Sequence, residues 1–314
     1  MIDEEEYLIS YANLKSNLFK HQKNFCNPIL IKKFYNNSSF GFPICLPKGI
    51  RFFNYSKAKY FEIDIKSFSK TIFKTNNIDY VGVKKFFRYG NLFAFNVSIK
   101  SKYKKKLDSY INKTNNLKKK IKKLKLENKK ICAMQIRNVP HLGHEAVFRY
   151  ILSNFDMLFL NPIYGIKKKN DFSDLYISKA LKYIKKKYNN TEFDPIWTNF
   201  YYAGPREALH HMLMRQSLGF DYFYVGRDHA GAENLYPQAE AVKIVNKFKK
   251  NFKIQPFTSK GGYYCKECKN YVIKGFCKHK NLINISGTDF RECMRKKIIY
   301  KHADKMIQKI IFKV

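Results

Sequence analysis

Two segments of this chain join a short apolar run to a turn rich in polar side chains, and this pattern limits the fold more than any other feature. Residues 131–134 (ICAM) lead into QIRNVPHLGH at 135–144, and residues 222–225 (YFYV) lead into GRDHAG at 226–231. Such apolar runs are typical of buried strands, and residues 145–152 have apolar side chains at helical spacing. The polar turns therefore follow strands, where open α/β sheets bind their ligands.

The first of these turns carries the donors that an anion site needs. His141 and His144 are three residues apart, so both can face one ligand, and imidazole N–H groups can donate to phosphate oxygens. Arg137 supplies a planar, permanent positive charge, while Gln135 and Asn138 add neutral donors. A helix that starts here also offers free backbone N–H groups and the positive end of its dipole. The turn predicts a phosphate-binding pocket, and hence a nucleotide-using enzyme.

Four segments in the same order resemble the ATP sulfurylases (sulfate adenylyltransferases). The family patterns QTRNPxHxxH, MRYAGPREA, GRDHAG and ISGTxxR are similar to QIRNVPHLGH at 135–144, FYYAGPREA at 200–208, GRDHAG at 226–231 and ISGTDFR at 285–291. A fifth segment, YVGVKKFFRYGN at 80–91, is similar to the family's HPGV region. The resemblance is strong from about residue 131 to residue 295 and weak before residue 80.

Three positions depart from the family patterns. Ile136 stands where the family has Thr, and the proline is displaced by one position to Pro140. Tyr201 replaces the Arg of MRYAGPREA, which removes a guanidinium that could hold a phosphate or a neighbouring acid. The HLGH at 141–144 also fits the wider HxGH nucleotidyltransferase signature, which implies the same chemistry.

The resemblance implies direct adenylyl transfer, in which a sulfate oxygen attacks the α-phosphorus of ATP and yields adenosine 5′-phosphosulfate and pyrophosphate. Arg137 and Gln135, with the backbone N–H of Ala230, are expected to hold sulfate. His141 and His144 are expected to stabilise the departing pyrophosphate, and Mg²⁺ is expected on the phosphates. The residues implied to act in catalysis are Arg137, Asn138, His141 and His144. The residues implied to bind ATP are Gln135, Ile136, Arg137, Asn138, Gly226, Arg227, Asp228 and His229, with Asn138 orienting the α-phosphate.

A cysteine cluster near the C-terminus predicts a metal site. Cys265 and Cys268 have the two-residue spacing that lets both thiolates reach one ion, and Cys277 and His279 can complete a tetrahedral set. Protein would fill all four positions, so the pattern predicts a structural Zn²⁺, with a disulfide or unused thiols as the alternatives. A similar knuckle occurs in a subset of the family. The other four of the 7 cysteines show no such spacing and are expected to be buried or inert: Cys26, Cys45, Cys132 and Cys293.

The charge of the chain does not by itself indicate a nucleic-acid partner. Lys and Arg number 61 against 24 Asp and Glu, which gives a net charge of +37. The basic residues are mainly Lys, scattered among abundant Asn, Ile, Phe and Tyr, and AT-rich codons explain this set without any ligand. The densest run, residues 100–130, has Leu117, Ile121 and Leu124 at helical spacing and is interpreted as one helix with a solvated basic face. A tethering or RNA-binding role for it is the alternative.

No segment predicts secretion or a membrane span. The start MIDEEEYLIS lacks a basic, then apolar, leader, and no apolar stretch is long enough for a bilayer. Together with the thiol-rich knuckle, this predicts a cytoplasmic protein without a membrane partner. The family resemblance implies a homo-oligomer, expected to be a dimer.

The expected fold class is α/β, with a Rossmann-like, doubly wound parallel sheet in the catalytic domain at 130–257. Residues 1–129, with short β-like runs at 42–46 and 92–97, are expected to form a β-rich, PUA-like domain in abbreviated form. Residues 258–314 are expected to form a small zinc-binding α/β segment. In the catalytic domain, strands are predicted at 131–134, 157–160 and 222–225, and helices at 145–152, 173–188, 205 onward and 237–248.

Two alternative functions remain open. One is another HxGH nucleotidyltransferase with a different acceptor, or a remnant of a class I aminoacyl-tRNA synthetase, although the lysine-rich KMSK-type loop of that class is not found. The other is a zinc-stabilised RNA-binding protein with a vestigial pocket. For the GRDHAG segment itself, the alternative to a binding role is that Asp228 pairs with an arginine and His229 caps the helix that follows.

Overall fold

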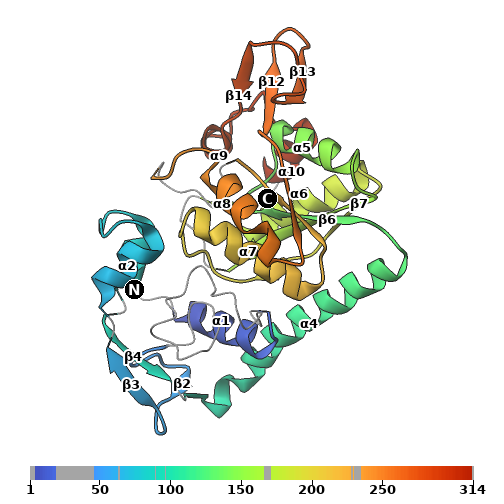
Figure 1. The fold of residues 1–314 in the computed structure, drawn as a ribbon. Coiled ribbons are helices and arrows are strands. Elements are labelled where there is room, and N and C mark those ends of the chain that lie inside the picture. The colour runs from blue at the N-terminus through green and yellow to red at the C-terminus, as the bar shows by residue number, and fades with distance from the viewer. Residues whose placement is uncertain are drawn as a thin grey trace.

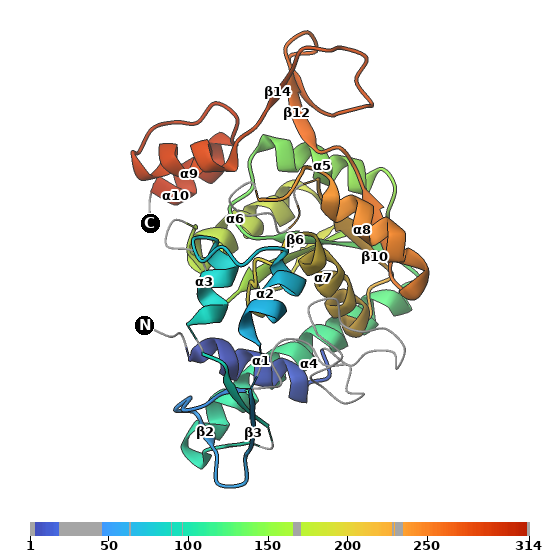
Figure 2. The ribbon, with the colours of Figure 1, turned by 60° about the vertical axis from the view of Figure 1, so that its left-hand side comes forward.

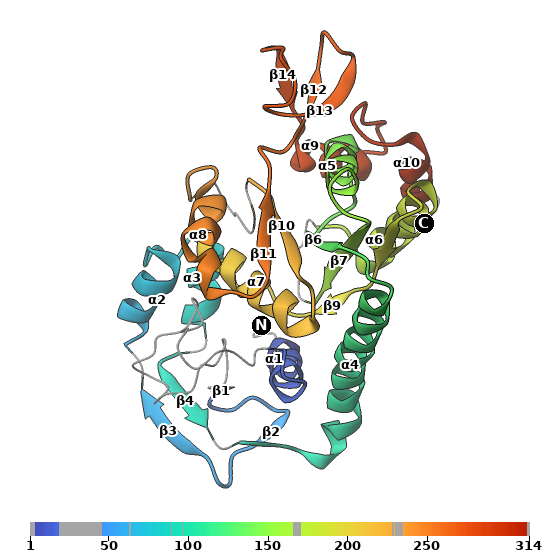
Figure 3. The same ribbon diagram turned by 45° about the vertical axis from the view of Figure 1, so that its right-hand side comes forward.

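The computed structural model describes residues 4–18, 46–62, 64–88, 90–95, 97–165, 171–227, 229 and 235–312. At its centre is a parallel sheet with the strand order β11-β10-β6-β7-β8 (Figure 3). Its strands are β6 (Ile131–Ile136), β7 (Met157–Tyr164), β8 (Thr191–Phe193), β10 (Tyr222–Val225) and β11 (Gln255–Thr258), and β9 (Ile196–Trp197) pairs in parallel with the end of β7. The predicted parallel sheet is confirmed.

The strand order places a switch point between β6 and β10. From β6 the chain proceeds to β7 and β8 on one side, and it then returns to add β10 and β11 on the other side. The two crossovers that leave this point diverge, which opens a crevice at the carboxyl ends of β6 and β10. Both polar turns predicted from the sequence follow these two strands.

Alternate residues of β6 belong to two different cores, as a sheet covered on both faces requires. Ile131 and Ala133 belong to one core, while Cys132 and Met134 belong to the other. Helices from distant parts of the chain cover each face (Figure 3). The first face is covered by α4 (Lys104–Leu126), α7 (Pro205–Leu218) and α8 (Glu240–Phe248), and the second by α5 (Leu142–Leu152), α6 (Asp174–Lys187), α9 (Gly287–Arg295) and α10 (Lys305–Phe312).

Local signals fix the ends of several helices, and the starts of α6 and α7 agree with the predictions. Pro205 occupies the first turn of α7, where its missing N–H costs nothing, and Gly219 ends the helix with φ 103°. Ser173 caps α6 by accepting a hydrogen bond from the N–H of Tyr176. The start of α5 is earlier than predicted, at Leu142, which places His144 within the helix.

The long basic segment forms the predicted helix. In α4, Leu117 and Ile121 are buried against the sheet, Leu124 is half-buried, and many of the lysines are exposed. The helix runs from the N-terminal strands to the sheet and packs on α1 (Figure 3). It therefore joins the two parts of the molecule.

The described N-terminal residues are mainly helical, so the prediction of a β-rich domain was wrong for this part of the chain. Helices α1 (Glu5–Lys15), α2 (Ile65–Phe73) and α3 (Val81–Phe87) outweigh five strands of two to four residues: β1 (Leu46–Pro47), β2 (Phe53–Asn54), β3 (Lys59–Glu62), β4 (Leu92–Phe95) and β5 (Ser98–Ile99). Among these described strands, pairing is limited to a β1-β4-β3 sheet and a β2-β5 pair, which close no barrel. The physical reason is that the apolar residues of α1, such as Tyr7, Leu8 and Ile9, are buried against β2 and α4 and not within a sheet. The predicted run at 42–46 lies outside the described residues except for Leu46.

A small antiparallel sheet projects from the body of the molecule (Figures 1 and 2). Its order is β13-β12-β14, formed by β12 (Gly262–Cys265), β13 (Asn270–Ile273) and β14 (Leu282–Asn284). Among the described residues, Ser101–Tyr103 and Lys249–Asn251 form 3-10 helices. Within the described ranges, no helix is long and apolar enough to cross a bilayer.

Candidate active site at the switch point

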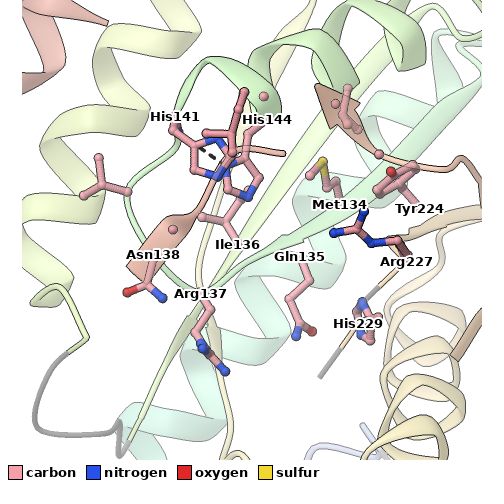
Figure 4. A pocket seen from close by; sticks show the side chains of 18 of the residues that line it. Met134, Gln135, Ile136, Arg137, Asn138, His141, His144, Tyr224, Arg227 and His229 are labelled. Atoms are coloured by element: carbon pink, nitrogen blue, oxygen red, sulfur yellow. Dashed lines mark hydrogen bonds between the residues drawn. The ribbon is translucent and has the colours of Figure 1, made fainter. Parts of the chain in front are cut away.

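A cavity of about 430 Å³ lies at the carboxyl ends of β6 and β10 (Figure 4). The sequence placed Arg137 and Arg227 in two separate motifs, 90 positions apart, and the fold brings both to the wall of this one cavity. The predicted site residues that line it are Gln135, Ile136, Arg137, Asn138, His141, His144, Gly226, Arg227 and His229. Asp228 and Ala230 lie outside the described residues, so their predicted roles are not tested.

His141 and His144 lie side by side at the start of α5, with their ring planes tilted by 42° (Figure 4). Their ring centroids are 3.9 Å apart, and the backbone N–H of His141 donates to Nδ1 of His144 over 3.3 Å. Because Nδ1 of His144 accepts this bond, the proton of the neutral ring is on Nε2, which remains able to donate to a ligand. Among the described residues, no group bonds the buried Nδ1 of His141.

Both rings are neutral at physiological pH. Burial, together with the neighbouring imidazoles of His144 and His302, holds the pKa of His141 well below its usual value. Burial also lowers the pKa of His144 to about 4. The pair can therefore act as neutral N–H donors and does not add charge to the pocket.

An acid that no sequence motif indicated orients two of the predicted residues. Oδ1 of Asp171 accepts a hydrogen bond of 3.2 Å from the amide of Asn138, and Oδ2 lies 3.6 Å from Nε of Arg137. Oδ1 of Asn138 in turn accepts from the N–H of Phe172 over 3.1 Å. The guanidinium of Arg137 also lies over the ring of Phe200, 5.8 Å from its centroid. The side chain of Asp171 is only 3% exposed, so it can fix this geometry.

Arg227 approaches the cavity from the β10 side and contacts the projecting sheet. Its Nη1 donates to the hydroxyl of Tyr263 on β12, and its Nη2 lies 3.4 Å from Oδ1 of Asn284 on β14. Next to it, Nε2 of His229 lies 2.9 Å from Nδ1 of the buried His211. His211 is buried in α7, and its contact with His229 supports a residue that lines the cavity.

Gln135 and Ile136 contribute to the cavity in different ways. Gln135 lies between Arg137 and His229 at the end of β6 (Figure 4), and its buried Oε1 has no hydrogen-bond partner among the described residues. The side chain of Ile136 is buried in the core beneath α5 and α6, so this residue offers a ligand its backbone and an apolar surface.

The FYYAGPREA segment at 200–208 is held in place by buried contacts. Glu207 is fully buried and accepts hydrogen bonds from the N–H groups of Tyr201 and Ala203, while burial raises its pKa to about 7. Tyr201, which replaces the family arginine, is buried with its hydroxyl 3.4 Å from Oγ of Ser10 on α1. It does not line the cavity, so the substitution adds an internal contact to the N-terminal part.

Several residues that line the cavity were not predicted from the sequence. Thr288 and Arg291 belong to the ISGTDFR segment, and Nη2 of Arg291 donates to Oγ1 of Thr288 over 3.0 Å. The similarity of this segment to the family pattern ISGTxxR could have indicated both as site residues. Tyr224 lies on β10, beside the second polar turn. Tyr263 and Asn284 carry no such signal, because only the packing of the projecting sheet against α5 brings them to the cavity.

The four predicted metal ligands come together in the projecting sheet. Their ligand atoms, from Cys265, Cys268, Cys277 and His279, lie within 4.8 Å of one another. The Sγ atoms of Cys265 and Cys277 are 3.7 Å apart, those of Cys268 and Cys277 are 3.8 Å apart, and Nδ1 of His279 is 3.2 to 3.5 Å from the three sulfurs. A tetrahedron with Zn–S bonds of about 2.3 Å has edges of roughly 3.8 Å, so the set fits Zn²⁺ and is too open for a disulfide. Of the other cysteines, Cys132 is buried and Cys293 half-buried, while Cys26 and Cys45 lie outside the described residues.

A Rossmann-like sheet with a cavity of guanidinium, amide and imidazole groups at its switch point defines an α/β protein of the doubly wound class, whose ligands bind at such a point. A family model described as ATP-sulfurylase matches residues 108–302, which is more than half of the chain. The chain belongs to the ATP-sulfurylase family.

Curated relatives agree with this assignment. The chain is 42% identical over 168 residues to the sulfate adenylyltransferase of Pyrococcus abyssi, a match that covers 52% of this chain and 44% of the relative. The corresponding protein of Persephonella marina is 31% identical over 243 residues, covering 75% of this chain and 63% of the relative. The chain therefore spans about half the length of the archaeal relatives that it matches.

One solved structure shares the fold. A hexameric APS kinase from Thiobacillus denitrificans superposes with a TM-score of 0.50 at 13% identity, covering 71% of this chain and 43% of that chain. At this identity the likeness supports the mixed α/β architecture alone.

Proposed function

We propose that the chain is a sulfate adenylyltransferase that converts ATP and sulfate to adenosine 5′-phosphosulfate and pyrophosphate, reversibly. The observation that carries the proposal is the shared cavity, which is lined both by Arg137 after β6 and by Arg227 after β10. Family membership and the names of the relatives support the same reaction.

In the proposed reaction, a sulfate oxygen attacks the α-phosphorus of ATP in line while the bond to the β-phosphate oxygen breaks. Arg137 and Gln135 hold sulfate, with the backbone N–H of Ala230 as a further donor. Because sulfate is a weak nucleophile, the rate must come from orientation and from stabilising the charge that develops on the departing group. No covalent enzyme intermediate is needed.

The leaving pyrophosphate is assigned to the start of α5. His141 and His144 offer neutral N–H donors there, and the helix dipole favours a negative group. Asn138, held by Asp171, orients the α-phosphate. Arg227 contacts the nucleotide, with Ile136, Gly226, Asp228 and His229 completing its binding site. Mg²⁺ bound to the phosphates would neutralise part of their charge.

We also propose that the chain belongs to the zinc-containing subset of the family, with Zn²⁺ bound by Cys265, Cys268, Cys277 and His279. The edge lengths of the cluster support this assignment. Since protein groups fill all four positions, the ion would hold the projecting sheet together. The division at residues 129 and 257 into N-terminal, catalytic and C-terminal parts, and a homodimeric state, remain predictions. Light scattering of the purified chain tests the oligomeric state.

The reverse reaction tests the proposed function most directly. The purified chain is incubated with adenosine 5′-phosphosulfate, pyrophosphate and Mg²⁺, and ATP is measured by luminescence. We expect ATP to form, and to fall by about 100-fold to 1000-fold in Arg137→Ala, because that guanidinium binds the transferred oxyanion. Arg295→Ala, an exposed position on α9, is the matched control and should retain activity.

Two results would point to the alternative functions. ATP formation no higher than in Arg137→Ala, with ATP binding intact, would indicate a nucleotidyltransferase that uses another acceptor. A chain that neither forms nor binds ATP, but binds RNA in a salt-sensitive way, would be a zinc-stabilised RNA-binding protein.

A further inference from the structure

The projecting sheet contributes residues to both the metal cluster and the cavity. On β12, Tyr263 faces the cavity and Cys265, two residues later, belongs to the metal cluster. Residues two apart on a strand point to the same side, so one short segment of backbone serves both sites. The position of Tyr263 therefore depends on the hairpin that the four metal ligands define.

Tyr263 and Asn284 act as a pair on one face of this sheet. They are direct cross-strand partners in the antiparallel β12–β14 ladder, so their side chains lie side by side. The hydroxyl of Tyr263 accepts from Nη1 of Arg227, and Oδ1 of Asn284 is 3.4 Å from Nη2. The two acceptors thus hold both terminal nitrogens of one guanidinium.

The chemistry of these acceptors suits a phosphate-binding arginine. A hydroxyl and an amide oxygen are neutral, so they orient the planar fork of Arg227 without cancelling its positive charge. The ring of Tyr263 adds a second contact, because the guanidinium lies 5.4 Å from its centroid. Lys274 lies 5.3 Å from the same centroid and adds further positive charge beside the ring.

We infer that the metal-binding hairpin forms a wall of the nucleotide site, in which Tyr263 and Asn284 position Arg227 for a phosphate of the bound nucleotide. This inference rests on the proposed function. Tyr263 and Asn284 are positioning residues, since they act through Arg227. The hairpin accordingly contributes to nucleotide affinity as well as to the stability of the fold.

The test is a double-mutant cycle on ATP binding, measured by isothermal titration calorimetry of the full chain with Mg²⁺ and ATP. Tyr263→Phe removes the hydroxyl and keeps the ring, and we expect about tenfold weaker binding, the effect of losing a hydrogen bond to a charged group. Asn284→Ala, at an exposed position where folding is not at risk, should weaken binding by about threefold. In the Arg227→Ala background, Tyr263→Phe should add no further loss, because the group that it positions is gone.

Tyr264 provides a matched control on the same strand. It faces the opposite side of the sheet, with its ring 5.2 Å from that of Tyr271 and 5.4 Å from that of His302. Tyr264→Phe should therefore bind ATP within about twofold of the unaltered chain, although it perturbs β12 to a similar degree. A purely structural role of the hairpin would make the Tyr263 and Tyr264 variants alike.

Unaltered ATP affinity in both Tyr263→Phe and Asn284→Ala would overturn the inference, as would losses that add fully in the double variant with Arg227→Ala. If the unaltered chain forms ATP from adenosine 5′-phosphosulfate and pyrophosphate, either of these results would leave the proposed function intact. A chain that neither binds nor forms ATP would overturn both. In an active chain, we further expect Tyr263→Phe to raise KM for adenosine 5′-phosphosulfate while kcat changes little.

Discussion

The backbone of Gly262, at the start of β12, lies directly against the backbone of Gly143 in the first turn of α5. A methyl group on Gly262 would lie 2.0 Å from the carbonyl oxygen of Gly143. This contact seats the projecting sheet on the turn that carries His141 and His144. Glycine is needed there because no side chain fits between the two backbones.

Gly262→Ala should therefore separate β12 from α5. We expect a loss of about 1–3 kcal/mol in the free energy of unfolding, measured by urea denaturation, because the backbone must shift to admit the methyl group. Gly287→Ala is the matched control, since the nearest atom to its added methyl group would be 3.9 Å away. Equal stability of the two variants would contradict this packing.

Asp171→Ala should lower activity without unfolding the chain. The carboxylate orients Asn138 and lies beside Arg137, and loss of alignment by about 1 Å can cost on the order of 100-fold in rate. The measurement is the rate of ATP formation from adenosine 5′-phosphosulfate and pyrophosphate. Asp221→Asn, an exposed partner of Lys125, serves as control and should keep its rate. A fully active Asp171→Ala would show that the carboxylate does not orient the site.

The buried imidazole of His144 should make stability depend on pH. Its pKa is about 4 in the folded chain and near 6.5 when exposed, so the unfolded state binds the proton first as the pH falls. Stability is therefore lost as the pH falls through the window from about 6.5 to about 4. The contribution of Glu207 to stability has the opposite pH dependence. Its pKa is raised to about 7 in the folded chain, so its contribution falls as the pH rises toward that value.

Comparison of the unaltered chain with His144→Asn isolates the contribution of the imidazole to the pH dependence of stability. Between about pH 7 and pH 5 we expect the unaltered chain to lose about 1–2 kcal/mol more than the variant in urea denaturation. The contribution of Glu207 is common to both chains and cancels. Parallel pH profiles would show that the ring is not buried in its neutral form.

The metal cluster predicts about one Zn²⁺ per chain, measurable by atomic absorption, and a lower Tm after treatment with a chelator. Cys268→Ser should lose the ion and unfold the C-terminal part, because one thiolate of the tetrahedron is removed. Cys293→Ser, on α9 and outside the cluster, should keep both the ion and the Tm. A Tm unchanged by the chelator would argue against the site.

Lys187 joins three helices through two acids. Its Nζ lies 2.7 Å from Oε2 of Glu145 on α5 and 2.6 Å from Oδ2 of Asp304 before α10. Lys187→Met should cost about 2–3 kcal/mol of unfolding free energy, because Glu145 is buried and would lose its cation. Lys186→Met, at the exposed neighbouring position, should change stability by less than about 0.5 kcal/mol. A small effect at Lys187 would mean that solvent reaches Glu145.

The sequence by itself determined the local parts of the site. Apolar runs followed by polar turns predicted β6 and β10, helical spacing predicted α4, and Pro205 indicated the start of α7. These features depend on neighbours within a few residues, so they can be read from the chain. The spacing of Cys265 and Cys268 indicated a metal site for the same reason.

Only the tertiary structure decided which distant groups meet. The order of the strands, not any motif, brought Arg137 and Arg227 to one cavity, and the seating of β12 on α5 added Tyr263 to its wall. Asp171 acquired its role because it packs against Asn138, 33 positions away. The N-terminal part was predicted as β-rich, yet apolar residues of helix α1 are buried against α4. Side-chain contacts between segments far apart in the chain decide such choices, and no local pattern contains them.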